Sequence, residues 1–346
     1  MEFKTVATVK KDDDGKRCDR IFRIVLGEMP LSRIYREIRS GFLRINGRRT
    51  KQDARVAEGD TVDVAAPLME FVHTQEPKKT VPTINRGAFQ KRIIYEDDNI
   101  LILNKKKGEL VHPDGKSGSF TTLDRIVKDY LGFSREDSIA FAPGPLHRLD
   151  RNTSGMIAFG KTAQGARDFS MALQNRETRK CYIALLDGTL SQQAMWHDRL
   201  LRDNNANYSQ ILPLKSTQGD EVITIATPFL CSNGLTLAQV EIKTGRTHQI
   251  RAQASYHKHP LTGDLKYHGS PNDSGYYLHS CCIIADGKAY TGMPGQDFIT
   301  DISILMCCSK NKVISAIENT IASFAGETHQ SSNICKNSPY SVIETS

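Results

Sequence analysis

Long apolar runs are absent from this sequence of 346 residues. A membrane-spanning helix needs about 20 predominantly apolar residues, and no uninterrupted apolar stretch of even about 18 occurs. The first residues, MEFKTVATVKKDDD, also lack the apolar core of a secretory signal. We therefore expect a cytoplasmic protein that makes no membrane contact.

Paired metal-binding cysteines are missing as well. The eight cysteines form no C-x-x-C pair, so a zinc site has little support. The helix expected around His248 carries no second histidine or acid three or four residues away. We expect no bound metal and, in a reducing compartment, free thiols.

Charge gives the first positive signal. The sequence has 46 Lys and Arg against 39 Asp and Glu, a formal net charge of +7. Between Arg17 and Arg55 there are eleven basic and four acidic residues, and 11 − 4 = +7, so the remainder sums to about zero. A basic block on a neutral body indicates a polyanion-binding module attached to a second unit.

The length suggests two folded units. We expect an N-terminal lead over residues 1–16 and a small α/β domain over 17–72. Residues 21–26 read as one helix, and Ser32 is expected to cap a second helix that ends at Gly41. Asn46-Gly47 marks a tight turn between two strands. The second helix carries arginines at spacing three, which form a basic stripe: Arg33, Arg36 and Arg39.

Residues 73–92 have little apolar periodicity and read as a linker. In residues 93–306 strand patterns dominate and helices intervene irregularly. This order predicts an α+β fold with a mixed or antiparallel sheet rather than a doubly wound parallel one. Residues 307–346 read as an extension with one amphipathic helix followed by a disordered end.

The stretch GPLHRLDRNTSG, residues 144–155, is a polar loop between apolar segments, where functional residues concentrate. Asp150 is flanked by Arg148 and Arg151, with His147 nearby. Cations close to a carboxylate favour its ionised form, and such a carboxylate in a cleft can act as a nucleophile or base. A surface turn with a local ion pair is the alternative.

Two further stretches carry weaker signals. In KTGRTHQIRAQA, residues 243–254, Thr247 is expected to cap a helix that carries His248 and Arg251, with Arg246 placed to bind phosphate. A solvated helix start explains the same pattern. Tyr182, in a predicted strand, is either a core tyrosine or a ring that stacks on a base.

Taken together, these stretches resemble RluA-type pseudouridine synthases. HRLDRNTSG matches the signature that holds the family's catalytic aspartate. YEDDNILILNKKKGELVHP, the Tyr182 strand, and GRTHQIR followed by HPLTGD resemble its other motifs, in family order over about residues 93–304. The basic unit resembles an S4-type RNA-binding domain. The tail after about residue 307 matches nothing.

The resemblance implies an enzyme that isomerises uridine to pseudouridine in RNA without metal or cofactor. It makes Asp150 the nucleophile, pairs Arg251 with it and lays Tyr182 against the uracil, while Arg148 fills the place that the flipped base leaves. A central cleft is implied between these residues. The expected RNA-binding residues are Arg148, His147, Arg151, Arg246, His248, Arg33, Arg36, Arg39, Arg48 and Arg49.

Large-subunit ribosomal RNA is the expected partner, and we expect a monomer. Transfer RNA is the second candidate substrate. A non-catalytic RNA-binding protein on the same fold would not need Asp150, whose charge repels phosphate. A phosphate-ester hydrolase using Asp150 as its base usually needs a cluster of metal-binding carboxylates, and none is apparent in the sequence.

Overall fold

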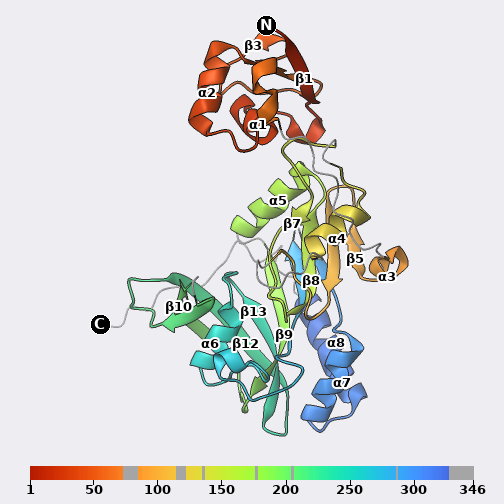
Figure 1. The fold of residues 1–346 in the computed structure, drawn as a ribbon. Helices are drawn as coiled ribbons and strands as arrows, with labels where there is room; N and C mark the ends of the chain where they lie inside the picture. Colours follow the sequence, from red (N-terminus) through yellow and green to blue (C-terminus); the bar gives the residue numbers. More distant parts are fainter. Residues whose placement is uncertain are drawn as a thin grey trace, which may run out of the picture.

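The computed structural model describes residues 1–72, 85–113, 122–134, 137–175, 178–203, 206–285 and 287–326. Figure 1 shows a small N-terminal unit above a larger body whose long strands form a single sheet. Among these residues no helix has the length and apolar character needed to cross a membrane.

The N-terminal unit packs two helices against a four-stranded sheet of order β1-β4-β2-β3. Its elements are β1 (Phe3–Thr8), η1 (Lys11–Asp13), α1 (Cys18–Val25), α2 (Leu31–Ser40), β2 (Leu43–Ile45), β3 (Arg48–Arg49), β4 (Thr61–Ala65) and η2 (Ala66–Phe71). Both predicted helices and the Asn46-Gly47 turn are present. Gly41 ends α2 with φ of 80°, a conformation that glycine adopts without strain.

Two expectations for this unit are wrong. Ser32 lies inside α2, whose N-cap is Pro30, so Ser32 does not cap the helix. Strand β1 pairs antiparallel with β4 along Phe3–Thr8, which places residues 3–8 of the expected lead of residues 1–16 inside the sheet. The basic composition that defined the unit begins only at Arg17, so it could not reveal this strand.

The larger unit contains eleven strands in one sheet, in the order β11-β10-β12-β13-β9-β14-β8-β6-β5, with β15 on β14 and β7 on β8. The strands are β5 (Ile93–Glu96), β6 (Ile100–Lys105), β7 (Gly144–Pro145), β8 (Ser154–Gly160), β9 (Arg179–Asp187), β10 (Ala194–Asp203), β11 (Tyr208–Leu212), β12 (Asp220–Ser232), β13 (Leu235–Ile242), β14 (Leu278–Ala285) and β15 (Lys288–Thr291). Strands β8 and β14 run parallel, and the other described pairs run antiparallel. The expected mixed sheet is therefore confirmed.

Both faces of this sheet are buried. Alternate residues of β9 enter different cores: Tyr182 and Ala184 belong to one, Cys181 and Ile183 to the other. The helical elements are α3 (Arg86–Gln90), α4 (Leu123–Tyr130), α5 (Ala163–Gln174), α6 (Gln249–Tyr256), η3 (Leu265–Tyr267), α7 (Gln296–Leu305) and α8 (Lys310–Gly326). Helices α3, α4 and α6 pack on the Tyr182 face, and α5, α7 and α8 pack on the opposite face.

The structure differs from both expected boundaries of this unit. Phe89 of α3 is buried in the core of the large sheet, so the end of the expected linker over residues 73–92 belongs to the larger unit. Residues 73–84 lie outside the described residues. Helix α8 buries Val313, Ile317 and Phe324 in the second core, so the extension is part of the fold as far as residue 326. The disorder expected further on falls outside the described residues.

The two units are joined through a buried carboxylate. Asp13 is fully buried and accepts hydrogen bonds from the Ser138 hydroxyl (2.8 Å) and from the N–H groups of Ile139 (2.6 Å) and Ala140 (2.8 Å). Lys16 lies 3.1 Å from the same carboxylate. Burial opposes ionisation, but these hydrogen bonds outweigh it and lower the pKa of Asp13. Asp13 thus links the units.

A second contact lies beside the first. Asp12 accepts a hydrogen bond of 2.8 Å from the N–H of Ala163, the first residue of α5. A carboxylate at a helix N-terminus satisfies an unpaired N–H and interacts favourably with the helix dipole. Neighbouring acids on one short segment therefore bind two separate parts of the larger unit.

We predict that Asp13→Ala loosens the junction between the units. The substitution leaves the N–H groups of Ile139 and Ala140 without an acceptor, which costs about 2–3 kcal/mol of unfolding free energy. Urea unfolding measures this loss, and small-angle X-ray scattering should show a larger radius of gyration. Asp14→Ala is the control, because Asp14 is exposed and bonds only within its own unit, to Glu58. Equal behaviour of the two variants would contradict the prediction.

Candidate active site

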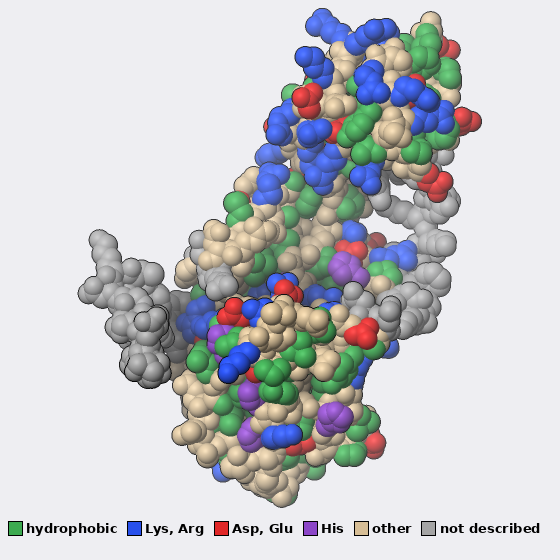
Figure 2. Space-filling view, turned by 90° about the vertical axis from the view of Figure 1, so that its left-hand side faces the viewer, with side chains coloured by type: hydrophobic (Ala, Val, Ile, Leu, Met, Phe, Trp, Pro, Cys, Tyr) green, Lys and Arg blue, Asp and Glu red, His purple; other side chains and the backbone are tan. Residues whose placement is uncertain are grey.

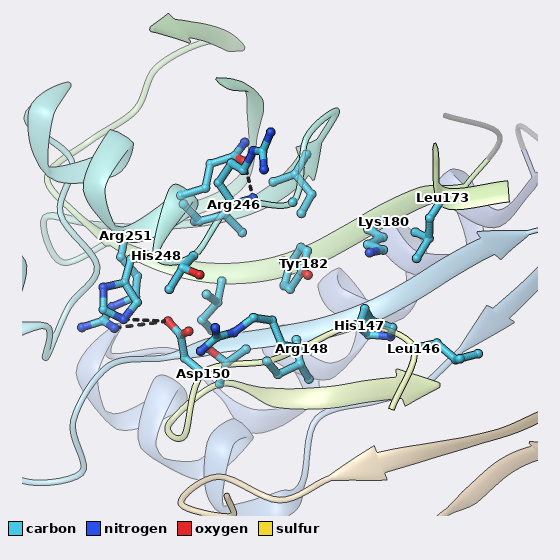
Figure 3. Close-up of a pocket in the computed structure, with 18 residues that line it drawn as sticks. Leu146, His147, Arg148, Asp150, Leu173, Lys180, Tyr182, Arg246, His248 and Arg251 are labelled. Carbon is cyan, nitrogen blue, oxygen red and sulfur yellow. Dashed lines mark hydrogen bonds and ion pairs between the residues drawn. The ribbon is translucent and has the colours of Figure 1, made fainter. Parts of the chain in front are cut away.

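A cavity of about 360 Å³ lies on the Tyr182 face of the sheet. Figure 3 shows Asp150, Arg251 and His248 at one end, Tyr182 in the middle, and Lys180 and His147 toward the other end. It is lined by the loop before β8, the C-terminal end of α5, the start of β9, the turn between β13 and α6, and one residue of β14. The residues are Leu146–Asp150, Thr153, Leu173, Lys180, Tyr182, Ile242, Gly245–Arg251 and Leu278.

The loop that carries Asp150 is held at its exit by Gly155. Gly155 has φ of 107°, and a Cβ there would overlap the backbone of Ser280. The two residues are register partners in the parallel pair of β8 and β14. Only glycine permits both the conformation and the close approach, so the end of the Asp150 loop is fixed against β14.

Lys105 supports the same loop from beneath. Its ammonium donates to the carbonyl oxygens of Lys106 (3.1 Å), Arg151 (2.9 Å) and Thr153 (2.7 Å), and the residue is 1% exposed. Burial lowers the pKa of Lys105 to about 8. Carbonyl groups take the place of the water that the buried ammonium has lost, and in return the lysine fixes the backbone on the C-terminal side of Asp150.

Arg251 links two carboxylates. Its Nη1 lies 3.2 Å from Oδ2 of Asp150, while Nε and Nη2 donate to Asp264 at 2.6 and 2.8 Å. Although burial disfavours the charge, the hydrogen bonds to Asp264 raise the pKa of Arg251 above its usual value. A bidentate bond fixes the plane of the guanidinium, so Asp264 sets the direction in which Arg251 meets Asp150.

Two aromatic rings complete the surroundings of Arg251. The guanidinium carbon lies 4.9 Å from the ring centre of Tyr267 and 4.5 Å from that of Tyr276, within the range of cation–π attraction. The hydroxyl of Tyr276 lies 3.3 Å from that of Thr153 in the Asp150 loop. The rings exclude water from the ion pair and tie it to the loop.

His248 faces Asp150 as a neutral ring. The Tyr267 hydroxyl accepts the N–H of Ser209 (2.9 Å) and therefore donates to Nδ1 of His248 (2.9 Å). The proton of the ring is then on Nε2, which lies 3.7 Å from Oδ2 of Asp150. Burial lowers the pKa of His248 to about 4, so near neutral pH the ring supplies a dipole and no charge.

Tyr182 forms the middle of the cavity wall and is 5% exposed. Burial, followed by the charge of Asp150, raises the pKa of its hydroxyl. The phenol therefore stays neutral at physiological pH. A flat, neutral, largely apolar ring beside a carboxylate is suited to hold a planar base against that carboxylate.

The structure brings most of the predicted site residues together. Seven of them line the cavity: Asp150, Tyr182, Arg251, Arg148, His147, Arg246 and His248. Arg151 is not among them, because its exposed side chain donates to the carbonyl of Gly108 (3.2 Å) outside the cavity. Thr247 does not cap α6. The N-cap is His248, whose φ of 58° turns the chain into the helix.

The five predicted arginines of the N-terminal unit lie on α2 and β3, away from the cavity. Arg33 packs over the ring of Phe71 (4.5 Å), and Arg36 pairs with Glu37 (3.1 Å). Arg39 and Arg48 are exposed. Figure 2 shows Lys and Arg side chains distributed over this face of the unit and along the edge that leads toward the body below.

Sequence reasoning missed several residues of the site. Lys105, Lys180 and Asp264 all fall within stretches that were recognised, but no role was assigned to them. A lysine at the end of a predicted buried strand was the available signal for Lys105. Nothing local marks Tyr267 or Tyr276, whose contact with Arg251 arises only in the folded chain.

The site combines the ion pair of Asp150 and Arg251, at one end of a cavity large enough for a nucleotide, with the aromatic wall formed by Tyr182. Outside the cavity, a separate basic unit offers a surface for a polyanion, and together these features are typical of an enzyme that acts on RNA. Residues 99–256 match the family described as RNA pseudouridylate synthase. Ribosomal large subunit pseudouridine synthase C of Vibrio vulnificus is 30% identical over 267 residues, 76% of this chain and 79% of that protein. The Escherichia coli K12 protein of the same name is 30% identical over 265 residues, with the same coverage.

The chain belongs to this family, and it is an isomerase that forms pseudouridine in RNA. A solved human structure, RNA pseudouridylate synthase domain containing 4, superimposes with a TM-score of 0.52 at 16% identity, covering 64% of this chain and 95% of that one. That likeness concerns the fold. Membership of the family, together with the names of these relatives, sets aside the non-catalytic alternative and the hydrolase alternative.

Behind the site, His279 is a fully buried neutral ring. Its Nε2–H donates to the carbonyl of Gly292 (3.1 Å), and its Nδ1 accepts the hydroxyl of Ser154 (2.9 Å). Burial lowers the pKa of His279 to about 4. Protonation would require Nδ1 to lose its acceptor role within the packed sheet.

We predict that stability falls as the pH is lowered from about 6.5 toward 4. The unfolded chain binds a proton at His279 near pH 6.5, whereas the folded chain does not until about pH 4. Acid therefore favours unfolding, by up to about 3 kcal/mol for this residue. Urea unfolding between pH 4.5 and 7.5 should show a steeper decline for the wild type than for His279→Gln, which cannot titrate. If the free energy of unfolding depends on pH in the same way in both proteins, the prediction is refuted.

Proposed function

We propose that Asp150 carries the isomerisation, acting at C1′ of a uridine that has been turned out of its RNA. The observation that supports this most directly is the contact of 3.2 Å between Arg251 and Asp150 at the end of the cavity. The guanidinium complements the negative charge of the carboxylate, and a charged carboxylate is a much stronger nucleophile and base than a neutral carboxyl group. The side chain of Asp150 remains 17% exposed, so a ligand can reach it.

The reaction breaks the bond from C1′ to N1 and forms one from C1′ to C5, while C5 loses its hydrogen as a proton to solvent and N1 takes up a proton. Asp150 either attacks C1′ or starts an elimination at the ribose, and both routes need the ionised carboxylate. The uracil that is released must turn before it bonds again. The ring of Tyr182 confines it beside the sugar, which favours recombination over escape.

A uridine within folded RNA is reached by extruding it from the stack, at a cost of a few kcal/mol. Arg148 lies in the cavity lining with an exposed side chain. We assign it to the space that the extruded base leaves, where its planar guanidinium can stack on neighbouring bases. Arg246, at the turn before α6, is placed to contact the RNA backbone.

The proposed substrate is large-subunit ribosomal RNA. The two bacterial relatives are named for that substrate and align over most of their length. We further propose that residues 1–72 form an S4-type RNA-binding domain in which Arg39 and Arg48 meet phosphates. Arg33, Arg36 and Arg49 contribute positive charge to the same surface. Such an enzyme acts in the cytoplasm, where the ribosome is assembled.

Asp150→Asn is predicted to abolish pseudouridine formation. The amide keeps the shape and can still bond to Arg251, but it has no charge with which to attack or to start elimination. Pseudouridine mapping of ribosomal and transfer RNA from cells that carry the variant measures the loss and also identifies the substrate. Asp168→Asn is the control, because Asp168 lies on α5 and does not line the cavity. Normal conversion by Asp150→Asn would exclude the proposed role.

Arg39→Ala/Arg48→Ala is predicted to weaken RNA binding without slowing the chemical step. Each contact between an arginine and a phosphate that is lost reduces the slope of log affinity against log salt concentration by about 0.7–0.9. The slope should therefore fall by about 1.5, and KM should rise while kcat on saturating ribosomal RNA stays within about twofold. Affinity and slope equal to those of the wild type would show that this surface does not bind the RNA.

A further inference from the structure

Lys180 occupies the end of the cavity remote from Asp150. It precedes Tyr182 by two residues on β9, so both side chains leave the same face of the strand, with Cα atoms about 7 Å apart. Figure 3 shows Lys180 beyond Tyr182 on this wall, near Leu173 of α5. The mechanism above gives this lysine no task, although it lines the cavity.

The ammonium of Lys180 has neither a hydrogen-bond acceptor nor a carboxylate partner among the described residues. The neighbouring acid Glu241 bonds instead to Arg179 (2.9 Å) and Lys243 (2.6 Å). Burial lowers the pKa of Lys180 to about 8. A partly desolvated cation without a partner is costly, and an anion that arrives from outside would remove that cost.

A second unused donor lies at the same end. Nε2 of His147 accepts the N–H of Ala158 (3.1 Å), so the neutral ring carries its proton on Nδ1. That Nδ1 is buried and has no hydrogen-bond partner among the described residues. Burial, and then the charge of Lys180, lowers the pKa of His147 well below its usual value. The ring therefore stays neutral, and its N–H lies within the electrostatic influence of the lysine.

The charges along the cavity are distributed unevenly. Among the described residues that line the cavity, Asp150 is the only acid, and it is paired with Arg251 at the opposite end. The guanidinium of Arg246 lies 3.4 Å from the carboxylate of Asp220. Within the described part of the chain, the Lys180 end therefore combines a cation and an N–H group that have no partner, and no acidic side chain lines it.

The RNA substrate supplies a matching anion. The cavity, about 360 Å³, is of the size that holds a whole small ligand, and it extends past the base position at Tyr182. A backbone phosphate carries the full negative charge that a desolvated ammonium needs, whereas a uracil carbonyl carries only a partial one. A phosphate next to the target uridine would then lie at Lys180 while the ribose is held at Asp150.

We propose that Lys180, assisted by the N–H of His147, binds a backbone phosphate adjoining the target uridine and so holds the extruded nucleotide in register with Asp150. Lys180 is then a positioning residue of the reaction. This inference rests on the proposed function, since it takes the ribose of the target to lie at Asp150.

The test uses the full-length protein and large-subunit ribosomal RNA transcribed in vitro from the source organism's gene. Lys180→Met should raise Kd about five- to tenfold near physiological salt and reduce the salt slope by about 0.7, the value for one contact to single-stranded RNA. KM should rise in parallel, while kcat, followed by tritium release from C5-labelled uridine, stays within about twofold. Lys180→Arg should restore most of the affinity.

Lys288→Met is the matched control, because Lys288 is exposed on β15 and does not line the cavity. It should leave the affinity and the slope unchanged. Circular dichroism and thermal unfolding establish that each variant is folded. A Lys180→Met enzyme with wild-type affinity and slope overturns the proposal. So does a fall in kcat with an unchanged slope, which would place Lys180 in the chemical step or at the base.

A double-mutant cycle locates the contact. In a stem-loop around a mapped target uridine, one neighbouring phosphate at a time is replaced by a neutral methylphosphonate. At one position the replacement should weaken binding to the wild type about as much as Lys180→Met does, with no further loss when the two are combined. If the losses of affinity from Lys180→Met and from the methylphosphonate add at every neighbouring phosphate tested, the contact is refuted. If the wild type forms no pseudouridine in the ribosomal RNA, the proposed substrate fails, and this outcome is distinct from failure of the lysine assignment.

Discussion

The contact of Arg251 with two carboxylates is the interaction on which the site depends. An arginine that is 7% exposed must have its charge compensated, and Asp264 does so with two hydrogen bonds. The remaining nitrogen, Nη1, faces Asp150. Removal of one partner of a buried ion pair lowers the free energy of unfolding by about 3–5 kcal/mol. The contacts that set the geometry of this pair therefore also stabilise the surrounding region. The rings of Tyr267 and Tyr276 keep the guanidinium in place and the surrounding water out.

The large sheet places the ion pair of Arg251 and Asp150 at one end of a cavity. Parallel pairing of β8 with β14 requires Gly155 at the close approach to Ser280, and Lys105 holds the Asp150 loop by its carbonyl oxygens. Tyr182 enters from β9 because alternate residues of that strand face opposite cores. Tyr182 is therefore attached to a strand and Arg251 to the start of a helix, while the Asp150 loop is tied to the sheet at Gly155 and Lys105. Rigid elements position chemistry better than free loops do.

The N-terminal unit is also held in a defined position relative to the cavity. Asp12 and Asp13 hold the unit against the larger body through hydrogen bonds to backbone N–H groups and to Ser138. Its exposed arginines then lie at a fixed distance from the cavity, and a basic surface continues from one unit toward the other (Figure 2). A defined separation of the two fits the proposed role of the N-terminal unit in binding the RNA substrate.

The sequence by itself determined the helix that ends at Gly41 and the strands around Asn46-Gly47, because turn and cap preferences are local. It also singled out Asp150, Tyr182 and Arg251, which lie in recognisable stretches and line one cavity in the structure. Only the tertiary structure decided that β1 completes the first sheet, that α8 belongs to the core, and that Asp264 orients Arg251. These features depend on pairing between segments far apart in the chain, and no local pattern records which distant partner a strand or a charge will meet.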